Sequence, residues 1–402
     1  MVPALRKAFN TAFSPQRYEH FLKDLHSHYP GAIDFRVAET PVFIPKDFAA
    51  RLTDACESII DLIVDPGFSK LTERAIPAGD RVPGENDHSH FLAFDFGICV
   101  DPDNGEGYWQ PQLIEMQGFA SLYGFQAYYP DLLRRHFPIP DNYSQYLNGY
   151  DHTSYVEELS KTILGGLPPE QVILLELKPH EQKTRIDFYC TEDYLGIRTV
   201  CLTELIQEGK KLYYIHTATG KKTEIRRIYN RVIFDELNAA ASSLGPHVDI
   251  RQELDVEWVA HPNWFYRISK FMLPFIHHPA VPPTFFLNEI KQPPADLENY
   301  VLKPLFSFAG QGVVIDINPS DLENIKDPEN WILQRKVTYA DLIPTPDIPA
   351  KVELRIMYLW KDGDIRPRQA INLARLSKGK MIGVRYNKDK EWVGGSVCYF
   401  ER

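Results

Sequence analysis

The chain is poor in cysteine, and its basic residues do not outnumber its acidic ones. The five cysteines stand far apart, without a CxxC pair or the spacing of a disulfide framework. An odd, scattered set is typical of a reducing compartment, so we expect reduced, buried thiols in a cytoplasmic protein. With 44 basic and 54 acidic residues, the net charge is −10. That balance argues against nucleic acid as a partner.

Long apolar segments are absent from the sequence as well. No run approaches the roughly 18 apolar residues of a membrane-spanning helix. The first residues, MVPALRKAFN, lack the apolar core of a signal peptide. We therefore expect a soluble protein without a membrane partner. What is present suffices for a large core, because 402 residues, 44% of them hydrophobic, suggest about two to three domains.

Apolar periodicity divides the chain into four regions and predicts a mixed α/β fold. Residues 1–80 read mainly as helices, and residues 81–150 as a polar loop followed by a β-hairpin. Strands alternate with a short helix over residues 151–255, while residues 256–402 hold mostly antiparallel strands joined by tight turns. The clearest helix lies between Pro45 and Val64. Its apolar positions have helical spacing: Phe48, Leu52, Ala55, Cys56, Ile59, Ile60 and Ile63.

The hairpin after residue 90 carries three oxygen-bearing side chains. Asp95 lies in its first strand, and Glu115 and Gln117 leave the same face of the second strand. Apolar neighbours surround them, and a buried carboxylate pair without a cation is costly. Carboxylate and amide oxygens suit Mg²⁺, so we interpret the three residues as metal ligands. The alternative is the solvated face of an ordinary hairpin.

A second motif spans residues 300–317, YVLKPLFSFAGQGVVIDI. Two short apolar runs, Tyr300–Leu302 and Val313–Ile315, are predicted strands, with Lys303 and a glycine-rich turn between them. Glycines let backbone N–H groups approach an anion, and the lysine would direct its ammonium group to the same place. The alternative is a hairpin without chemistry. Lys270, one short helix and one loop upstream, is a second candidate cation.

Further cations gather on the C-terminal strands. These cations and two asparagines fall on or near predicted strands: Arg355, Arg368, Arg375, Arg385, Asn372 and Asn387. Several arginines on one sheet face are unusual unless they meet anions, and the planar guanidinium group suits phosphate and carboxylate. Arg231 also places a cation in an apolar strand, YNRVIF. There we expect a structural salt bridge.

Taken in order, these motifs resemble the circularly permuted ATP-grasp family, whose best-known relative is glutathionylspermidine synthetase. Its ordinary order is a lysine, a Lys-Pro glycine loop, a hinge strand, acid-x-Arg, and Arg-x-Asn with Gly-Gly, and the metal-binding acid and Glu-x-Asn come last. The matching positions here are Lys270, Lys303 with its loop, 334–337, Glu353-Leu-Arg355, and Arg385-Tyr-Asn387 with Gly394-Gly395. The acid and metal pair stand upstream, as Asp95 and Glu115-Met-Gln117. The resemblance covers residues 40–402.

The resemblance implies a permuted ATP-grasp fold with a Rossmann-like pre-ATP-grasp α/β domain and an N-terminal helical segment. In such a permutation, residues 392–399 should lie near the strand of residues 91–100. The implied activity is an ATP-dependent carboxylate–amine ligase that forms ADP through an acyl phosphate, acting on a small-molecule or peptide carboxylate and an amine. Residues 120–150 and 176–196 are candidate substrate loops, and the sequence does not identify either substrate.

The resemblance also assigns roles to single residues. Mg²⁺ would be held by Asp95, Glu115 and Gln117. The residues implied to bind ATP are Lys270, Lys303, Ser307, Gly310, Gln311, Gly312 and the hinge residues Gln334, Arg335, Lys336 and Val337. The residues implied in catalysis are Arg355, Arg385 and Asn387.

Three other functions stay open at this stage. Phosphoryl transfer without amide formation would use the same residues. The metal pair is Glu-x-Gln where the family usually has Glu-x-Asn, which leaves room for a non-catalytic ATP-binding scaffold or regulatory protein with a decayed metal site. A metal hydrolase would rest on His88-x-His90 and His277-His278, although histidines in loops are commonly solvated.

Overall fold

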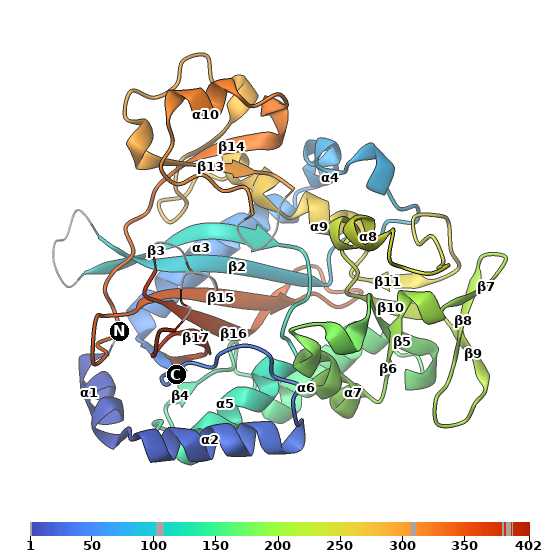
Figure 1. Cartoon of the computed structure of the whole chain (residues 1–402), viewed down its shortest axis with the longest axis horizontal. Helices are drawn as coiled ribbons and strands as arrows, with labels where there is room; N and C mark the ends of the chain where they lie inside the picture. The colour runs from blue at the N-terminus through green and yellow to red at the C-terminus, as the bar shows by residue number, and fades with distance from the viewer. Residues whose placement is uncertain (1, 102–107, 307–310, 380–381, 383–386, 388) are drawn as a thin grey trace.

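The computed structural model describes residues 2–101, 108–306, 311–379, 382, 387 and 389–402. It has a central antiparallel sheet, a parallel sheet to its right in Figure 1, and a small antiparallel sheet in a lobe at the top of that view. No helix in the described part of the chain combines the length and the apolar character that a bilayer crossing requires. Ser307, Gly310 and Arg385 lie outside the described residues.

The central sheet joins segments from distant parts of the chain. Its strands lie in the order β17-β16-β15-β2-β3, and all neighbours are antiparallel. Their bounds are β2 Phe91–Val100, β3 Trp109–Gln117, β15 Lys351–Leu359, β16 Arg368–Ser377 and β17 Gly394–Ser396. The predicted hairpin of β2 and β3 is therefore confirmed. Residues 394–396 share the sheet with β2, with β15 and β16 between them.

Helices precede and flank this sheet. Their bounds are α1 Pro3–Ala12, α2 Pro15–His28, α3 Lys46–Ile63 and α4 Phe68–Leu71. The seven apolar positions that predicted α3 are all buried, and α3 packs against β3 and against β18, Cys398–Glu401. Helical spacing thus identified the packed face correctly. All five cysteines are buried and unbridged, as expected.

The middle of the chain forms the parallel sheet. Its order is β11-β10-β5-β6, and every neighbouring pair is parallel. The strands are β5 Val172–Glu176, β6 Arg198–Cys201, β10 Arg227–Asn230 and β11 Glu257–Val259; the helices are α5 Phe125–His136, α6 His152–Leu164, α7 Arg185–Leu195 and α8 Phe234–Ala240. A separate antiparallel sheet follows β6: β7 Ile206–Glu208, β8 Lys211–Ile215 and β9 Lys222–Ile225.

The lobe contains the lysine of the glycine-loop motif. Its strands β12 Thr284–Phe286, β14 Trp331–Arg335 and β13 Tyr300–Pro304 are antiparallel in that order, with α10 Pro319–Glu323 beside them. The chain reaches it through α9, Pro262–Arg267, and a 3₁₀ helix, Lys270–Phe275. The strand expected at residues 313–315 is reduced to one bridge, in which Leu302 and Val314 exchange backbone hydrogen bonds of 3.0 and 2.9 Å.

A close backbone contact ties the C-terminal strands to the N-terminal region. The Gly395 N–H donates to Arg36 O (2.9 Å), and the Ala38 N–H donates to Gly395 O (2.8 Å). Gly394 has φ +119°, and a Cβ there would lie 2.3 Å from the Arg36 carbonyl oxygen. Nearby, β18 lies between β1 (Val42–Ile44) and β4 (Tyr143–Ser144).

Gly394 is therefore the position least able to accept a side chain. We expect Gly394→Ala to lower the free energy of unfolding by about 2–4 kcal/mol, because backbone strain and an overlap with Arg36 add together. Gly395→Ala is the matched control: its Cβ would have its nearest contact at 3.5 Å, so a loss below about 1 kcal/mol is expected. Equal denaturation midpoints for the two variants would contradict this account.

Candidate functional site

One face of the central sheet carries a group of charged side chains that we call the charge cluster: Asp95, Glu115, Glu353, Arg355 and Arg375. Antiparallel pairing brings these residues together, because Asp95 lies opposite Glu115 on β3 and opposite Arg355 on β15. Glu353 lies opposite Arg375 on β16. The register thus unites two acids predicted from the hairpin with residues more than 200 positions later in the chain.

Asp95 is the best-connected member. Its side chain is 2% exposed, and each carboxylate oxygen accepts a 2.6 Å hydrogen bond from Arg355, one from Nε and one from Nη2. Arg375 adds a third bond of 2.5 Å. Burial disfavours the charged carboxylate, but the two guanidinium groups outweigh it and hold the pKa of Asp95 below its usual range. Asp95 is therefore a buried anion.

Glu353 completes the cluster at β15. It forms an ion pair with Arg375 and accepts a 3.1 Å hydrogen bond from the Tyr339 hydroxyl. Burial raises the pKa of Glu353 to about 7; Arg375 opposes this rise, while Asp95 adds to it. Sequence reasoning missed Glu353 and Arg375 as members of one site. The signal that could have found them is their alternation with Arg355 on paired strands.

Two lysines approach the cluster from outside the central sheet. The Lys303 ammonium group donates to Gln334 Oε1 (2.6 Å) and to Ile114 O (3.1 Å), so this lysine of the lobe reaches β3. Burial lowers its pKa, and Glu115 opposes that effect. Burial also lowers the pKa of Lys270 to about 8, with Glu115 acting against it and Lys303 with it. The structure therefore brings the two predicted lysines together beside Glu115.

The side chains predicted to bind metal carry carboxylate and amide oxygens, and Mg²⁺ prefers oxygen ligands. In the structure, the oxygens of Asp95 and Gln117 are bonded to Arg355. With its amide oxygen turned toward Arg355, Gln117 accepts from Nη1 at 2.5 Å and from Nη2 at 3.3 Å, and Asp95 binds the same guanidinium group. Glu115 is half-buried beside them. Within the described residues, no group of three His, Cys, Asp or Glu side chains has a metal-binding arrangement.

The remaining predicted binding residues lie in the lobe, after β13 and at the end of β14. Gln311 and Gly312, the described part of the glycine turn, are exposed. In the hinge, the Arg335 and Lys336 N–H groups donate to Pro283 O (2.9 Å) and Asn299 O (2.7 Å), and Val337 is half-buried.

Asn387 comes ten residues after β16 in the sequence and is hydrogen-bonded to the end of that strand. Its Oδ1 accepts from the Lys378 N–H at 2.9 Å and from the Ser377 hydroxyl at 3.1 Å. Its assignment to catalysis, like those of the other site residues, stays a prediction.

Arg231 differs from the sequence expectation. It follows β10 at the carboxyl end of the parallel sheet, is 5% exposed, and lies over the rings of Phe119 (4.8 Å) and Phe188 (5.5 Å). Its Nε and Nη1 have no hydrogen-bond partner in the described structure, so the expected salt bridge was wrong. Burial raises the pKa of Glu176, at the end of β5, to about 8, and Arg231 opposes that rise. Two aromatic rings flank this cation, and the carboxyl groups of Asp187, Glu176 and Glu236 act on it through charge without a hydrogen bond.

The histidines proposed for a metal hydrolase have other partners. His88 stacks on Trp360 with ring centroids 4.3 Å apart, and His90 Nε2 lies 2.9 Å from Asp362. His278 Nε2 lies 3.2 Å from Asp54. These contacts are typical of structural histidines and do not support the metal-hydrolase hypothesis.

Comparison with known proteins shows a likeness of fold. No family model and no curated protein match the sequence. Among solved structures, the chain is similar to a glutathione synthetase-like effector, GSS30, from Globodera pallida in its apo form. The TM-score is 0.58 at 12% identity, over 97% of this chain and 98% of that chain. The chain therefore has a glutathione synthetase-like fold, consistent with an ATP-grasp-like arrangement.

We expect anion binding beside the cluster to depend on pH through Lys270. Because burial lowers the pKa of Lys270 to about 8, its ammonium group would be charged at pH 7 and mostly neutral at pH 9. Sulfate should then bind up to about tenfold more weakly at pH 9, the ratio of the charged fractions of Lys270 at the two pH values. Calorimetric titration measures this. Lys270→Arg keeps its charge, and an equally steep decline in that variant would exclude Lys270 as the titrating group.

Proposed function

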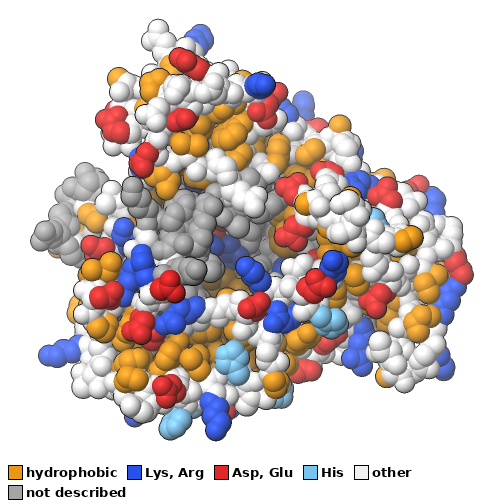
Figure 2. All heavy atoms as spheres, in the orientation of Figure 1, with side chains coloured by type: hydrophobic (Ala, Val, Ile, Leu, Met, Phe, Trp, Pro, Cys, Tyr) orange, Lys and Arg blue, Asp and Glu red, His pale blue; other side chains and the backbone are white. Residues whose placement is uncertain are grey.

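We propose that this protein is an ATP-dependent carboxylate–amine ligase that forms ADP through an acyl phosphate. The observation that carries the proposal is the approach of Lys303 to β3, where it bonds the Ile114 carbonyl oxygen, together with the action of Glu115 of the charge cluster on both Lys303 and Lys270. The site has four basic groups, the ammonium groups of the two lysines and the guanidinium groups of Arg355 and Arg375, and three carboxyl groups. This excess of basic groups favours the binding of phosphate oxygens. Figure 2 shows acidic and basic side chains on the body, along the edge that faces the lobe. The glutathione synthetase-like fold supports the same activity.

The proposed roles of the residues are as follows. Lys303 and Lys270 would bind the phosphates of ATP, with backbone groups at Gln311 and Gly312 closing over them. The hinge, residues 334–337, would receive the adenine edge through backbone groups other than the two N–H groups already bonded. Arg355, with Arg385 and Asn387, would stabilise the phosphoryl group as it passes to a substrate carboxylate oxygen. An amine would then attack the acyl carbon and release phosphate.

Mg²⁺, when bound, would neutralise the phosphate charge. Asp95, Glu115 and Gln117 would hold it, and Arg355 would have to release Asp95 and Gln117 to make room. The released guanidinium group would then be available to the phosphoryl group.

Circular permutation is part of this proposal. The hairpin of β2 and β3 carries the metal-ligand motif that ordinarily ends an ATP-grasp domain. The support for permutation is that β2 pairs directly with β15, which carries the acid-x-Arg motif from the other end of the chain.

Arg231 is the group we assign to the carboxylate substrate. It is a buried cation with unpartnered N–H groups, and it contacts Phe119, two residues beyond Gln117. Asp187, Glu176 and Glu236 act on Arg231 through charge without a hydrogen bond. A carboxylate bound there would accept the hydrogen bonds that Nε and Nη1 do not make. Phe188, its other ring contact, lies within residues 176–196, one of the loops singled out from the sequence.

A non-catalytic ATP-binding scaffold is the second candidate. The observation that favours it is the same Arg355 contact, because a guanidinium group bonded to two of the three metal-ligand positions can replace the metal permanently. Both candidates predict nucleotide binding, and only the ligase predicts turnover.

Nucleotide binding is tested by removing one ammonium group at a time. Lys303→Ala and Lys270→Ala should each weaken ATP binding by ~1–3 kcal/mol, the scale of a charge-assisted hydrogen bond. Lys291→Ala is the control, since Lys291 is exposed and outside both motifs. Calorimetry measures all three. Unchanged affinity in the two motif variants would refute the phosphate-binding assignment.

Turnover is tested with hydroxylamine, which traps an acyl phosphate as a hydroxamate. A ligase should release ADP and form hydroxamate with a suitable carboxylate, whereas a phosphotransferase should release ADP alone. Glu115→Gln removes a negative charge from the metal-ligand set and should abolish turnover, while Gln117→Asn should keep or raise it. If neither ADP nor hydroxamate forms across a broad panel of carboxylates and peptides, the scaffold is the better account. An unchanged rate in Glu115→Gln would show the metal assignment to be wrong.

A further inference from the structure

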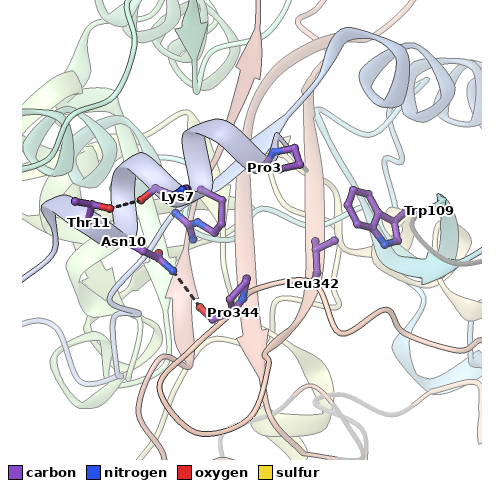
Figure 3. Close-up of a pocket in the computed structure, with 8 residues that line it drawn as sticks. Pro3, Lys7, Asn10, Thr11, Trp109, Leu342 and Pro344 are labelled. Atoms are coloured by element: carbon purple, nitrogen blue, oxygen red, sulfur yellow. Dashed lines mark hydrogen bonds between the residues drawn. The ribbon is translucent and has the colours of Figure 1, made fainter.

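A cavity of about 560 Å³ lies between helix α1 and the start of strand β3. Figure 3 shows α1 along one side, with Asn10 bonded to Pro344, and Trp109 on the other side of Leu342. Its principal lining residues are Arg6, Lys7, Asn10, Trp109, Leu342 and Pro344. Trp109 begins β3, whereas Glu115 and Gln117 lie near the end of that strand. The cavity is therefore separate from the charge cluster.

Arg6 is a buried cation with spare hydrogen-bonding capacity. It is 4% exposed, and its Nη1 donates to the Thr40 hydroxyl and to Pro41 O (3.3 Å). Its Nε and Nη2 have no partner in the described part of the chain. The guanidinium carbon lies 4.9 Å from the ring centre of Phe9 and 5.6 Å from that of Phe43. Burial lowers the pKa of Arg6 to about 9, which shows how little compensating negative charge surrounds it.

The rest of the lining has the same character. Lys7 is an exposed cation beside Arg6, and no acidic residue is among the described lining residues. Asn10 donates from Nδ2 to Pro344 O (3.4 Å), while its Oδ1 lacks a partner in the described structure. Trp109, Leu342 and Pro344 supply an apolar wall. The cavity thus joins two cations and a carboxamide to an apolar surface.

We infer that this cavity binds a small organic anion with a flat apolar body, of the class of aromatic carboxylates. The carboxylate would face the exposed ammonium group of Lys7, with the buried charge of Arg6 behind the cavity wall. The ring would lie against Trp109 and Leu342. This site does not depend on the proposed ligase activity.

The test compares indole-3-acetate with indole-3-acetamide, which has nearly the same shape and no charge. We expect calorimetry on the full chain to show the acetate binding at least tenfold more tightly than the amide. Lys7→Glu places a carboxylate at an exposed position on the cavity wall, so it should remove most of that preference without disturbing the fold. Lys23→Glu is the matched control, because it makes the same change of charge at an exposed position of α2 and should leave the preference intact.

Arg6→Gln tests the buried cation itself. A folded Arg6→Gln protein, checked by circular dichroism, should bind the two indoles with similar affinity. If that variant does not fold, the comparison of Lys7→Glu with Lys23→Glu still tests whether the cavity binds the carboxylate. Equal binding of acetate and amide to the wild-type protein, absence of acetate binding, or an acetate preference that Lys7→Glu leaves unchanged would each overturn the inference.

Discussion

The buried carboxylate of Asp95 is the group on which the charged face of the central sheet depends. A charge this deeply buried is tolerated only with paired and hydrogen-bonded partners, and Arg355 and Arg375 meet that need from two other strands. Removing one partner of such a pair typically costs about 3–5 kcal/mol, since the other charge is left uncompensated. The pairing of β2 with β15 is thus an electrostatic requirement as well as a backbone one. It joins segments 260 residues apart.

The same face also explains the placement of the lobe. Lys303 extends from β13 to the Ile114 carbonyl oxygen on β3, so one ammonium group connects the small sheet of the lobe to the central sheet. Glu115 moderates the loss of charge that burial imposes on Lys303 and Lys270. Glu115 thus helps both lysines to stay charged, and a bound anion would enter an arrangement already biased toward positive charge.

Helices and hairpins could be predicted well from the sequence, whereas contacts between distant segments could not. Helical spacing identified every buried apolar residue of α3. The predicted hairpin brought Asp95 alongside the strand of Glu115 and Gln117, and the structure places it opposite Glu115. The pairing of β2 with β15 was not predictable from local pattern, because register between distant segments is set by tertiary packing. That is why Glu353 and Arg375 were missed as site members. The salt bridge predicted for Arg231 was wrong for a different reason: a sequence shows a cation but not whether a carboxylate is hydrogen-bonded to it. The family resemblance implied a permuted ATP-grasp fold. The likeness to a glutathione synthetase-like structure is consistent with the ATP-grasp part of that prediction, and the permutation stays a prediction.

On the proposed function, the Arg355 contact would make metal and nucleotide binding interdependent. A divalent ion that takes the oxygens of Asp95 and Gln117 would have to displace the guanidinium group, which would then need a new anion. Without one, the ion would have to offset the cost of an unpaired buried charge, several kcal/mol by the measure of broken buried pairs. Phosphate oxygens would supply the new anion. Each ligand would thus lower the cost of binding the other, and this coupling would be reciprocal by thermodynamic necessity. A site built this way would stay closed to metal alone and would open when metal and phosphate arrive together.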